Sequence, residues 1–392
     1  MTGRIILVIN AGSSSIKFAA YDAASLKLRL RGAIEELRNT PAFSIHAEDA
    51  ALKTAFEDFP ASGDHARYTA WILYALEKIF PDDAVAIAGH RVVHGGLHYD
   101  APAKIDDAVL EDLQSLSPLA PNHQPHNLAA IRAVAEKSPA LPQIACFDTS
   151  FHRTQPRLAQ LFALPRDLID EGVLRYGFHG LSYDHIVHEL PTHLDAKSRR
   201  RVIAAHLGHG ASMCALQNGR SIATTMGFTA LDGLVMGARC GALDPGVVIH
   251  LIRQKGMSAD DVDKMLHSKS GMLGVSGISD DVRALLKSDD PKAEEALDLF
   301  AYRAAREIGS LMAALGGLDA LVFTAGIGEN SPDMRKRICA RADWTGLKLD
   351  EGLNEQNAGR ISAASSAVEV LVIPANEELV IARACKTALE ER

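Results

Sequence analysis

Residues 5–17 combine the side chains that proteins use to hold phosphate groups. An apolar run, 5–9, is followed by Asn10, Gly12, three serines and Lys17, and a second apolar stretch comes next. This pattern predicts two strands joined by a polar hairpin tip. Gly12 lets the backbone approach a ligand closely, the serines offer hydroxyls and amides, and Lys17 offers a positive charge. The residue spacing of a P-loop is absent. The alternative to a phosphate-binding hairpin is an ordinary serine-rich hairpin with an exposed lysine.

A second segment repeats this plan in the other half of the chain. Residues 201–212 form an apolar run that ends in His206, Gly208, Gly210 and small residues, and a second strand is expected after them. A turn at 218–219 and a short third strand follow. Two such hairpins indicate a duplicated domain that grips one polyphosphate from both sides.

The two hairpins carry a resemblance to a known family. INAGSSSIK (9–17) and HLGHGAS (206–212) resemble the two signatures of the acetate kinase family. Further blocks resemble the family's other motifs, in the family's order: HRVVHGG (90–96), CFDTSFH (146–152), RYGFHG (175–180), MGARCGALDPG (236–246), TAGIGEN (324–330) and PANEELVIA (374–382). The resemblance implies an α/β protein with the two-domain duplicated fold of the actin, Hsp70 and sugar kinase type, with the nucleotide in the interdomain cleft.

The composition of the chain limits the classes of protein to which it can belong. The chain has 392 residues, 47% hydrophobic and 23% charged, which suits two globular domains. A net charge of −8 argues against nucleic acid as a partner, because its phosphates require clustered cations, so local arginines must hold an anionic substrate. No apolar stretch suits a transmembrane helix and no signal peptide is recognisable, so we expect a cytoplasmic protein without a membrane partner. Five scattered cysteines fit reduced thiols.

Strands that alternate with helices predict the α/β class. Strands are expected near the N-terminus and over residues 85–93, 143–147, 202–205, 213–216, 221–225 and 318–324. Helices are expected over residues 66–80, 106–116, 125–136, 181–190, 246–254, 258–267 and 292–315. The first domain is expected over 1–148 and the second over 149–376. By resemblance, the last helix folds back, so that 377–392 complete the first domain.

Four residues match the family's catalytic positions. Arg91 follows a predicted strand and Arg239 lies in a glycine-rich segment, so we place both in loops, where arginine forks suit carboxylate or phosphate. His179 stands between glycines before a predicted helix, and the resemblance assigns it to the transferring phosphoryl group. Asp148 follows a buried strand directly. Without the resemblance, the two arginines would be interpreted as surface charges. His179 would be interpreted as a structural histidine, and Asp148 as a helix N-cap.

Asp148 need not remove a proton. Acetate, the nucleophile that the resemblance implies, is already an anion at neutral pH. We therefore expect Asp148 to organise an arginine or a magnesium-bound water. Asn10 and Glu377 match the family's positions for Mg²⁺, with Mn²⁺ as the alternative ion, and hard oxygen donors suit either. Glu378 adjoins Glu377, and an acidic pair at a helix N-terminus is the alternative interpretation.

The resemblance assigns ATP or ADP contacts to residues in four segments. They are Ser13, Ser15 and Lys17; His206, Leu207, Gly208, His209 and Gly210; Asp281, Val282 and Arg283; and Gly326, Ile327, Gly328, Glu329 and Asn330. The last segment is expected between a strand and a helix that begins at Ser331-Pro332.

Three positions depart from the family's pattern. His209 stands where the second signature commonly has Asn, and an imidazole can still donate to phosphate. Asn122 and Ala230 stand where the family has a Leu and a Pro that line the acyl pocket, while Val93 and Phe178 remain as its apolar wall. The departures leave the identity of the acyl group open.

The resemblance implies a phosphotransferase with a carboxyl group as acceptor, which transfers the γ-phosphoryl group of ATP to acetate by direct in-line displacement, reversibly. A propionate kinase of the same family is the alternative within the class. An ATPase scaffold similar to actin or Hsp70 is the rival from another class, although hydrolysis alone would not require Arg91, Arg239 and His179. The expected partners are a small carboxylate, a nucleotide and a second copy of the chain in a homodimer.

Overall fold

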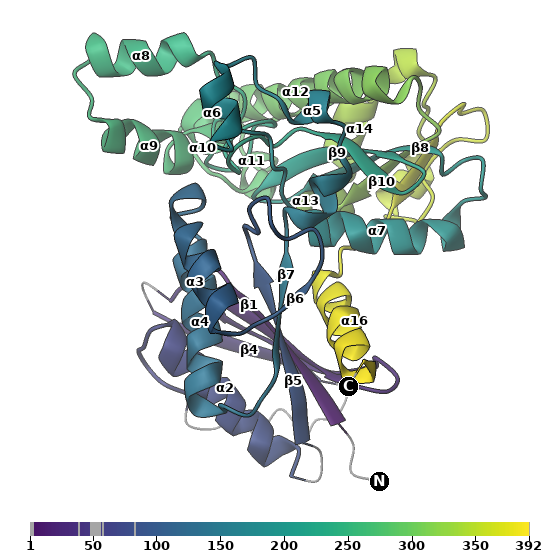
Figure 1. Cartoon of the computed structure of the whole chain (residues 1–392). Helices are drawn as coiled ribbons and strands as arrows, with labels where there is room; N and C mark the ends of the chain where they lie inside the picture. Colours follow the sequence, from purple (N-terminus) through teal and green to yellow (C-terminus); the bar gives the residue numbers. More distant parts are fainter. Residues whose placement is uncertain (1–3, 38–39, 48–55, 57–58, 82–83, 392) are drawn as a thin grey trace. The chain divides into compact units, whose positions relative to one another are not determined.

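A computed structural model describes residues 4–37, 40–47, 56, 59–81 and 84–391 of the chain. It divides into two compact units, Met1–Phe151 with Asn376–Arg392, and His152–Ala375 (Figure 1). We expected the boundaries at 148/149 and 376/377, within three residues of this division. In the described residues, no helix has the length and apolar character needed to cross a membrane.

The first unit is built on a mixed sheet of seven strands. Their order is β4 (Ala42–Ala47), β3 (Leu28–Glu35), β2 (Ile16–Asp22), β1 (Arg4–Ala11), β5 (Ala84–Val92), β7 (Gln143–Phe147) and β6 (Ala103–Lys104). Strands β1 to β4 are antiparallel neighbours, whereas β1, β5 and β7 run parallel. The sheet is covered on both faces, so residues 5–9 of its central strand β1 are all buried, which explains their continuous apolar run. Parallel pairing brings the carboxyl ends of β1, β5 and β7 to one edge.

Helices cover both faces of this sheet. The helices α2 (His65–Ile79), α3 (Asp107–Ser115) and α4 (Gln124–Lys137) lie on one side, and α16 (Glu377–Glu390) lies on the other (Figure 1). A short 3₁₀ turn, η1 (Ser117–Leu119), connects α3 to α4. Asp64 caps α2 by accepting from the Arg67 N–H, and Trp71 of α2 meets Phe43 of β4 edge-on at 5.0 Å between ring centroids.

The helix α16 lies directly against β5. A Cβ atom on Gly89 would come within 2.4 Å of Ile381 Cγ2 and 2.6 Å of Cys385 Sγ, so only glycine admits the helix at this distance. Asn376 caps its N-terminus by accepting from the Leu379 N–H. The last helix therefore belongs to the first unit, as the resemblance implied.

The second unit is built on five strands. Their order is β10 (Arg220–Thr224), β9 (Ala211–Gln217), β8 (Arg201–Leu207), β11 (Ala320–Thr324) and β12 (Glu369–Val372). The first three are antiparallel, and β11 runs parallel to both β8 and β12. The turn between β9 and β10 has φ of 49° at Asn218 and 78° at Gly219, which suits the predicted Asn-Gly hairpin. The second polar hairpin is thus confirmed, like the first.

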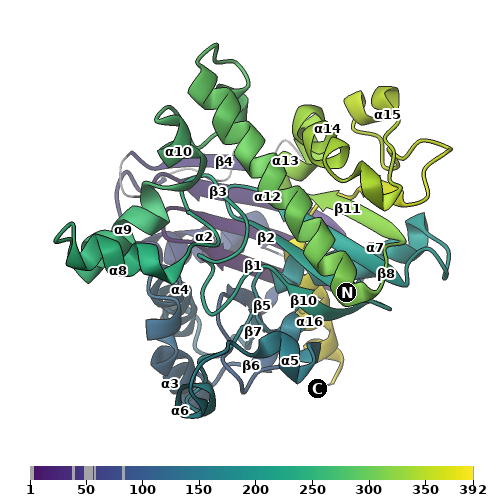
Figure 2. The ribbon, with the colours of Figure 1, turned by 90° about the horizontal axis from the view of Figure 1, so that it is seen from above.

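The helices of the second unit differ greatly in length. They are α5 (Arg157–Gln160), α6 (Arg166–Asp170), α7 (Gly180–His193), α8 (Pro245–Arg253), α9 (Ala259–Ser268), α10 (Gly271–Ser276), α11 (Val282–Leu285), α12 (Pro291–Leu315), α13 (Ala325–Asn330), α14 (Pro332–Ala340) and α15 (Glu351–Glu355), with the 3₁₀ turns η2 (Ser150–Thr154), which begins in the first unit, and η3 (Asp343–Thr345). The long helix α12 packs across β8, β9 and β10, while α8 and α9 lie side by side away from the sheet (Figure 2). Asp290 caps α12 at one end, and Gly316 ends it with φ of 68°.

The segment after β11 lies where the sequence predicted it. Residues 326–328 stand between β11 and α14 and form the short helix α13. Ala325, directly after β11, has a left-handed φ of +65°. Arg335, which is fully buried, then holds α13 by donating to the carbonyls of Gly328 and Glu329 at 2.9 and 3.0 Å.

Candidate active site

The residues that the sequence assigns to one site fall in both units, and each group is described within its own unit. In the first unit, the carboxyl ends of β1, β5 and β7 bring Asn10, Arg91 and Asp148 together. Arg91 donates from Nε to Asp148 Oδ1 at 3.0 Å and from Nη2 to Oδ2 at 2.6 Å. Its Nη1 donates to Asn10 Oδ1 at 3.3 Å.

We had expected Arg91 in a loop, but it lies within β5, which ends at Val92. Its side chain is only 20% exposed. Asp148, 1% exposed, follows β7 directly, as predicted. The arginine is therefore fixed both by its strand and by a bidentate carboxylate, a geometry that lysine could not reproduce.

A second carboxylate faces the same arginine. Glu377, in the first turn of α16, places Oε2 3.8 Å from Arg91 Nε, while Glu378 pairs with Arg31 at 3.7 Å. Burial raises the pKa of the Glu377 carboxyl; Arg91 opposes this rise and Asp148 adds to it. Burial alone would lower the pKa of the Arg91 guanidinium, but Asp148 and Glu377 together raise it. The two carboxylates thus keep the guanidinium charged.

The donors expected to hold a metal ion fit Mg²⁺ only in part. In the described part of the chain, no three His, Cys, Asp or Glu side chains gather closely enough to form a metal site by themselves. Asn10 and Glu377 offer hard oxygen atoms on either side of Arg91. Such a pair suits an ion that takes its remaining ligands from water and nucleotide phosphates, as Mg²⁺ does.

Two side chains that sequence reasoning missed support the first hairpin tip. Asn127, on α4, donates to the Ala11 carbonyl at 2.6 Å and accepts from the Val93 N–H at 3.0 Å. His65, the first residue of α2, donates from Nε2 to the Gly12 carbonyl at 2.6 Å. Asn127 therefore ties the end of β1 to the residue that follows β5. The only sequence signal was a polar residue on an otherwise buried helix face.

The remaining assigned residues of the first unit are placed as follows. Ser13 and Ser15 lie at the tip between β1 and β2, and Lys17, on β2, is exposed. Val93 is buried, whereas Asn122 is exposed in the turn before α4.

In the second unit, His179 sits in an unusual backbone conformation. Its φ of +59° is left-handed, and it forms the N-cap of α7. Its Nδ1 lies 2.8 Å from Ser212 Oγ on β9, and its ring stacks on His206 of β8 with centroids 4.1 Å apart. His206 in turn contacts Ser182 Oγ through Nδ1 at 2.8 Å. Left-handed backbone costs a non-glycine residue about 1–2 kcal/mol, and such strain gathers at functional sites.

The second hairpin tip brings His179 and Arg239 to one point. A Cβ atom on Gly210 would lie 3.4 Å from His179 Nε2 and 3.7 Å from Arg239 Nη1. Arg239 lies in a loop, as predicted, and its Nη1 donates to the Ala230 carbonyl at 3.0 Å. An imidazole and a guanidinium thus converge on glycine backbone, an arrangement that suits an anionic group. Phe178, next to His179, is buried.

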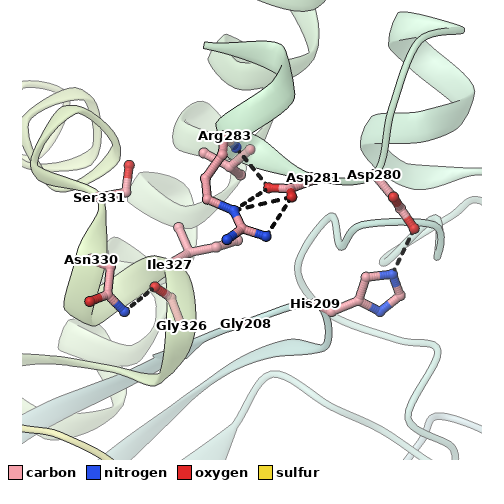
Figure 3. Close-up of a pocket in the computed structure, with 10 residues that line it drawn as sticks. Gly208, His209, Asp280, Asp281, Arg283, Gly326, Ile327, Asn330 and Ser331 are labelled. Atoms are coloured by element: carbon pink, nitrogen blue, oxygen red, sulfur yellow. Dashed lines mark hydrogen bonds and ion pairs between the residues drawn. The ribbon is translucent and has the colours of Figure 1, made fainter. Parts of the chain in front are cut away.

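A cavity of about 510 Å³ lies beside this tip (Figure 3). It is lined by Gly208, His209, Asp280, Asp281, Val282, Arg283, Gly326, Ile327, Asn330 and Ser331. Except for Asp280 and Ser331, these residues were assigned to the nucleotide from the sequence. Four of its polar side chains form two pairs, with Arg283 Nη2 donating to Asp281 at 2.7 Å and His209 Nε2 lying 3.0 Å from Asp280 (Figure 3).

Some assigned residues do not line this cavity. His206 and Leu207 are buried in β8, and Gly328 is buried in α13. The Glu329 carboxylate accepts from the Ala375 N–H at 2.8 Å, so it holds the backbone that leads into α16. Glu329 adjoins the cavity in sequence, but its side chain is engaged in this other contact.

Comparison with known proteins places this architecture in a family. Residues 5–383 match the Acetokinase family. The chain is 52% identical over 387 residues to an acetate kinase of Rhodopseudomonas palustris, covering 97% of each chain, and 46% identical over 401 residues to one of Methylocella silvestris, covering 99% of this chain and 98% of the other.

Solved structures lead to the same family. An acetate kinase of Porphyromonas gingivalis matches with a TM-score of 0.85 and 32% identity, over 98% of this chain and 100% of the other. A propionate kinase of Francisella tularensis matches with a TM-score of 0.88 and 32% identity, over 98% and 99%. The chain therefore belongs to the acetokinase family, and the expected fold class is confirmed.

Proposed function

We propose that this chain transfers the γ-phosphoryl group of ATP to acetate, giving acetyl phosphate and ADP, and that the reaction is reversible. Its family and the names of its relatives support a carboxyl-group phosphotransferase. The observation that carries the proposal is the convergence of His179 Nε2 and Arg239 Nη1 on Gly210, beside a cavity of nucleotide size. Phosphoryl transfer is mostly positioning and charge stabilisation, and these two nitrogens supply both.

The groups of the two units are proposed to serve the same reaction. The cavity takes the nucleotide, with Val282 and Ile327 as apolar walls and Arg283 as a cation at its rim. The serines and Lys17 of the first hairpin, and the glycine amides of the second, hold phosphate oxygens. His179 and Arg239 stabilise the charge of the transferring group, while Arg91 holds the carboxylate.

Asp148 acts on Arg91 and not on a proton. Both of its oxygens accept from Arg91, and its side chain is only 1% exposed, so the carboxylate is placed to orient the arginine. Acetate needs no base, because it is ionised at neutral pH. We assign Asp148 to the orientation of Arg91, in agreement with one of the two roles expected from the sequence.

A divalent cation completes the proposed chemistry. Asn10 and Glu377 would hold Mg²⁺, with Mn²⁺ as a substitute, and the ion would neutralise charge on the nucleotide phosphates. We also propose that the protein works in the cytoplasm as a homodimer. The homodimer comes from the family resemblance, and the cytoplasm from the sequence pattern and its scattered cysteines.

The acyl substrate has one specific alternative. Asn122 and Ala230 replace a larger aliphatic side chain and a proline of the family pattern, and their smaller apolar volume favours an additional methylene. Propionate is therefore proposed as a second substrate, with acetate preferred. One methylene is worth only about 1–3 kcal/mol in an apolar pocket, so discrimination is limited.

The experiment measures ATP turnover by the purified protein with and without formate, acetate, propionate and butyrate. Acyl phosphate is trapped with hydroxylamine, so that phosphoryl transfer is distinguished from hydrolysis. We expect turnover to require a carboxylate, with acetate the best and propionate next. ATP hydrolysis that is independent of any carboxylate would instead support the ATPase scaffold.

A further inference from the structure

The ring of His179 has a defined partner on the nitrogen that faces away from Gly210. Its Nδ1 lies 2.8 Å from Ser212 Oγ, while its Nε2 faces the Gly210 backbone. Ser212 Oγ makes a second, very short hydrogen bond with the phenol oxygen of Tyr183, on the helix that His179 caps. Ser212 and Tyr183 are both fully buried. Three polar atoms thus form a row that runs from the protein interior to the imidazole.

The chemistry of these groups gives the row a direction. A phenol is the strongest proton donor of the three, and a neutral imidazole nitrogen is the strongest acceptor. Burial raises the pKa of the Tyr183 hydroxyl well above its ordinary value, so the phenol keeps its proton. The favoured order is therefore Tyr183 donating to Ser212, and Ser212 donating to Nδ1 of His179. Hydrogen bonds in such a row polarise and strengthen one another.

The opposite face of the ring is restrained as well. His206 stacks on His179 with an interplanar angle of 18°, and its own Nδ1 contacts Ser182 Oγ. The left-handed backbone of His179 fixes the start of the side chain. Ring rotation that would exchange the two nitrogens must break the stack and the contact with Ser212. The orientation of the ring and the position of its proton are thus set by separate contacts.

We propose that Ser212 and Tyr183 are positioning residues that keep the proton of neutral His179 on Nε2, the nitrogen beside Gly210 and Arg239. This tautomer makes His179 a hydrogen-bond donor toward an anionic group, whereas the other tautomer would present a lone pair to it. The consequence for turnover rests on the proposed function. The tautomer itself does not, because it belongs to the free protein.

The first test reads the tautomer directly. Protein labelled with ¹⁵N in its histidines is examined by NMR at pH 8 without substrates, and the His179 signals are assigned from their loss in His179→Gln. We expect a protonated Nε2 and an unprotonated Nδ1 in the native protein. Ser212→Ala should give a mixture of both tautomers, and Ser212→Thr, which restores a hydroxyl, should return the native pattern. A protonated Nδ1 in the native protein would overturn the proposal.

The second test compares rates. Tyr183→Phe and Ser212→Ala should each lower kcat with acetate by roughly tenfold to a hundredfold, the scale on which the outer partners of a functional histidine act. KM for ATP and for acetate should change by much less. Tyr176→Phe is the matched control, because it also removes a buried phenol hydrogen bond, the one to the Gly172 carbonyl at 2.8 Å.

The outcomes separate the two proposals. Equal losses of kcat in Tyr183→Phe and Tyr176→Phe would mean that Tyr183 only supports the fold, and the inference would fail. An unchanged His179 spectrum in Ser212→Ala would also refute the inference. If that variant does not fold, the NMR spectrum and the kinetics are measured on Tyr183→Phe and Ser212→Thr. A native protein with the expected tautomer but no carboxylate-dependent turnover would refute the proposed function and leave the tautomer assignment standing.

Discussion

Asp148 accepts two parallel hydrogen bonds from Arg91, from Nε at 3.0 Å and from Nη2 at 2.6 Å. The pair joins the ends of two neighbouring parallel strands, so the sheet itself sets the separation of the two side chains. The arginine remains partly accessible at 20%, whereas the carboxylate is 1% exposed. The carboxylate is therefore the structural member of the pair, and the guanidinium is the member that can meet a ligand.

The first prediction concerns Asp148→Asn. The amide keeps the shape but can accept only one of the two hydrogen bonds, so one Arg91 N–H loses its acceptor and the guanidinium is held less firmly. We expect kcat to fall by roughly two orders of magnitude, and unfolding to become easier by about 1–3 kcal/mol. Steady-state kinetics and denaturant titrations measure the two effects.

The same variant distinguishes an organiser from a base. High magnesium should partly restore the rate of Asp148→Asn, and the rate should gain no new dependence on pH. A rate that follows the ionisation of added imidazole would identify Asp148 as a general base and contradict the assignment made above.

The second prediction compares Arg91→Ala with Arg239→Ala. Both should lower kcat by roughly two or more orders of magnitude, the scale of a lost preorganised electrostatic contact. Their stabilities should differ. Arg239 lies in a loop, so its loss should change the melting temperature little. Arg91→Ala leaves Asp148 and Glu377 without their shared cation and should be clearly destabilised. Circular dichroism melting of both variants is the measurement, and near-normal turnover in folded Arg239→Ala would refute the mechanism.

The third prediction concerns the acyl group. Asn122→Leu combined with Ala230→Pro restores the family pattern and should sharpen the preference for acetate over propionate. Ala230 contributes its carbonyl to Arg239, and a proline keeps that carbonyl. The quantity to compare is the ratio of kcat/KM for the two acids, in the native protein and in the double variant. An unchanged ratio would mean that these positions do not contact the acyl group.

The fourth prediction concerns the cavity. Arg283 is largely exposed at its rim and is held by Asp281. Arg283→Ala should raise KM for ATP by roughly tenfold, the loss of one charged contact, and leave KM for acetate nearly unchanged. Arg253→Ala, at the end of α8, is the control for a general change in charge. A rise in KM for acetate alone would contradict the assignment of this cavity to the nucleotide.

The fifth prediction concerns acid stability. Burial lowers the pKa of both His90 and His94 to about 4, from an unfolded value near 6.5. The unfolded chain therefore binds more protons between these values, and stability falls as the pH drops from about 6.5 to about 4, by up to roughly 3 kcal/mol for each histidine. Glu377, whose pKa is raised by burial, acts in the opposite direction.

The measurement is the melting temperature from pH 7 to pH 4.5 in the native protein and in His94→Gln. The variant is expected to start from a lower melting temperature, because the His94 Nδ1 accepts from the Gly96 N–H at 3.0 Å, and to fall less steeply with pH. Identical slopes for the two proteins would show that His94 does not titrate as described.

The sequence predicted the parts of the site that lie in local patterns. Both polar hairpins, the strand before Asp148 and the helix after Ser331 follow from apolar runs, glycine and proline, which act over a few residues. Most residues of the cavity were also found, because each stands in a recognisable motif. What joins the motifs, the parallel order of β1, β5 and β7, is a long-range property that no local pattern carries.

Other residues were not predicted, because their role depends on the direction in which the side chain points. Asn127, Tyr183 and Arg335 stand on helices, and nothing in the sequence shows which backbone or side chain they reach. Glu329 shows the reverse case, because its place in a motif suggested a nucleotide contact, but its carboxylate accepts from Ala375 instead. Arg91 was assigned to a loop although the predicted strand 85–93 included it, because the Gly95-Gly96 turn follows so closely.

The position of α16 against Gly89 has a consequence for biosynthesis. The second unit is one continuous stretch of chain, so all of it has been translated before residues 377–390 exist. The first unit, in contrast, is divided: the helix that covers β5, and the carboxylate that faces Arg91, are translated only after the whole of the second unit. On the ribosome, the sheet of the first unit must therefore wait with one face uncovered while the second unit is translated.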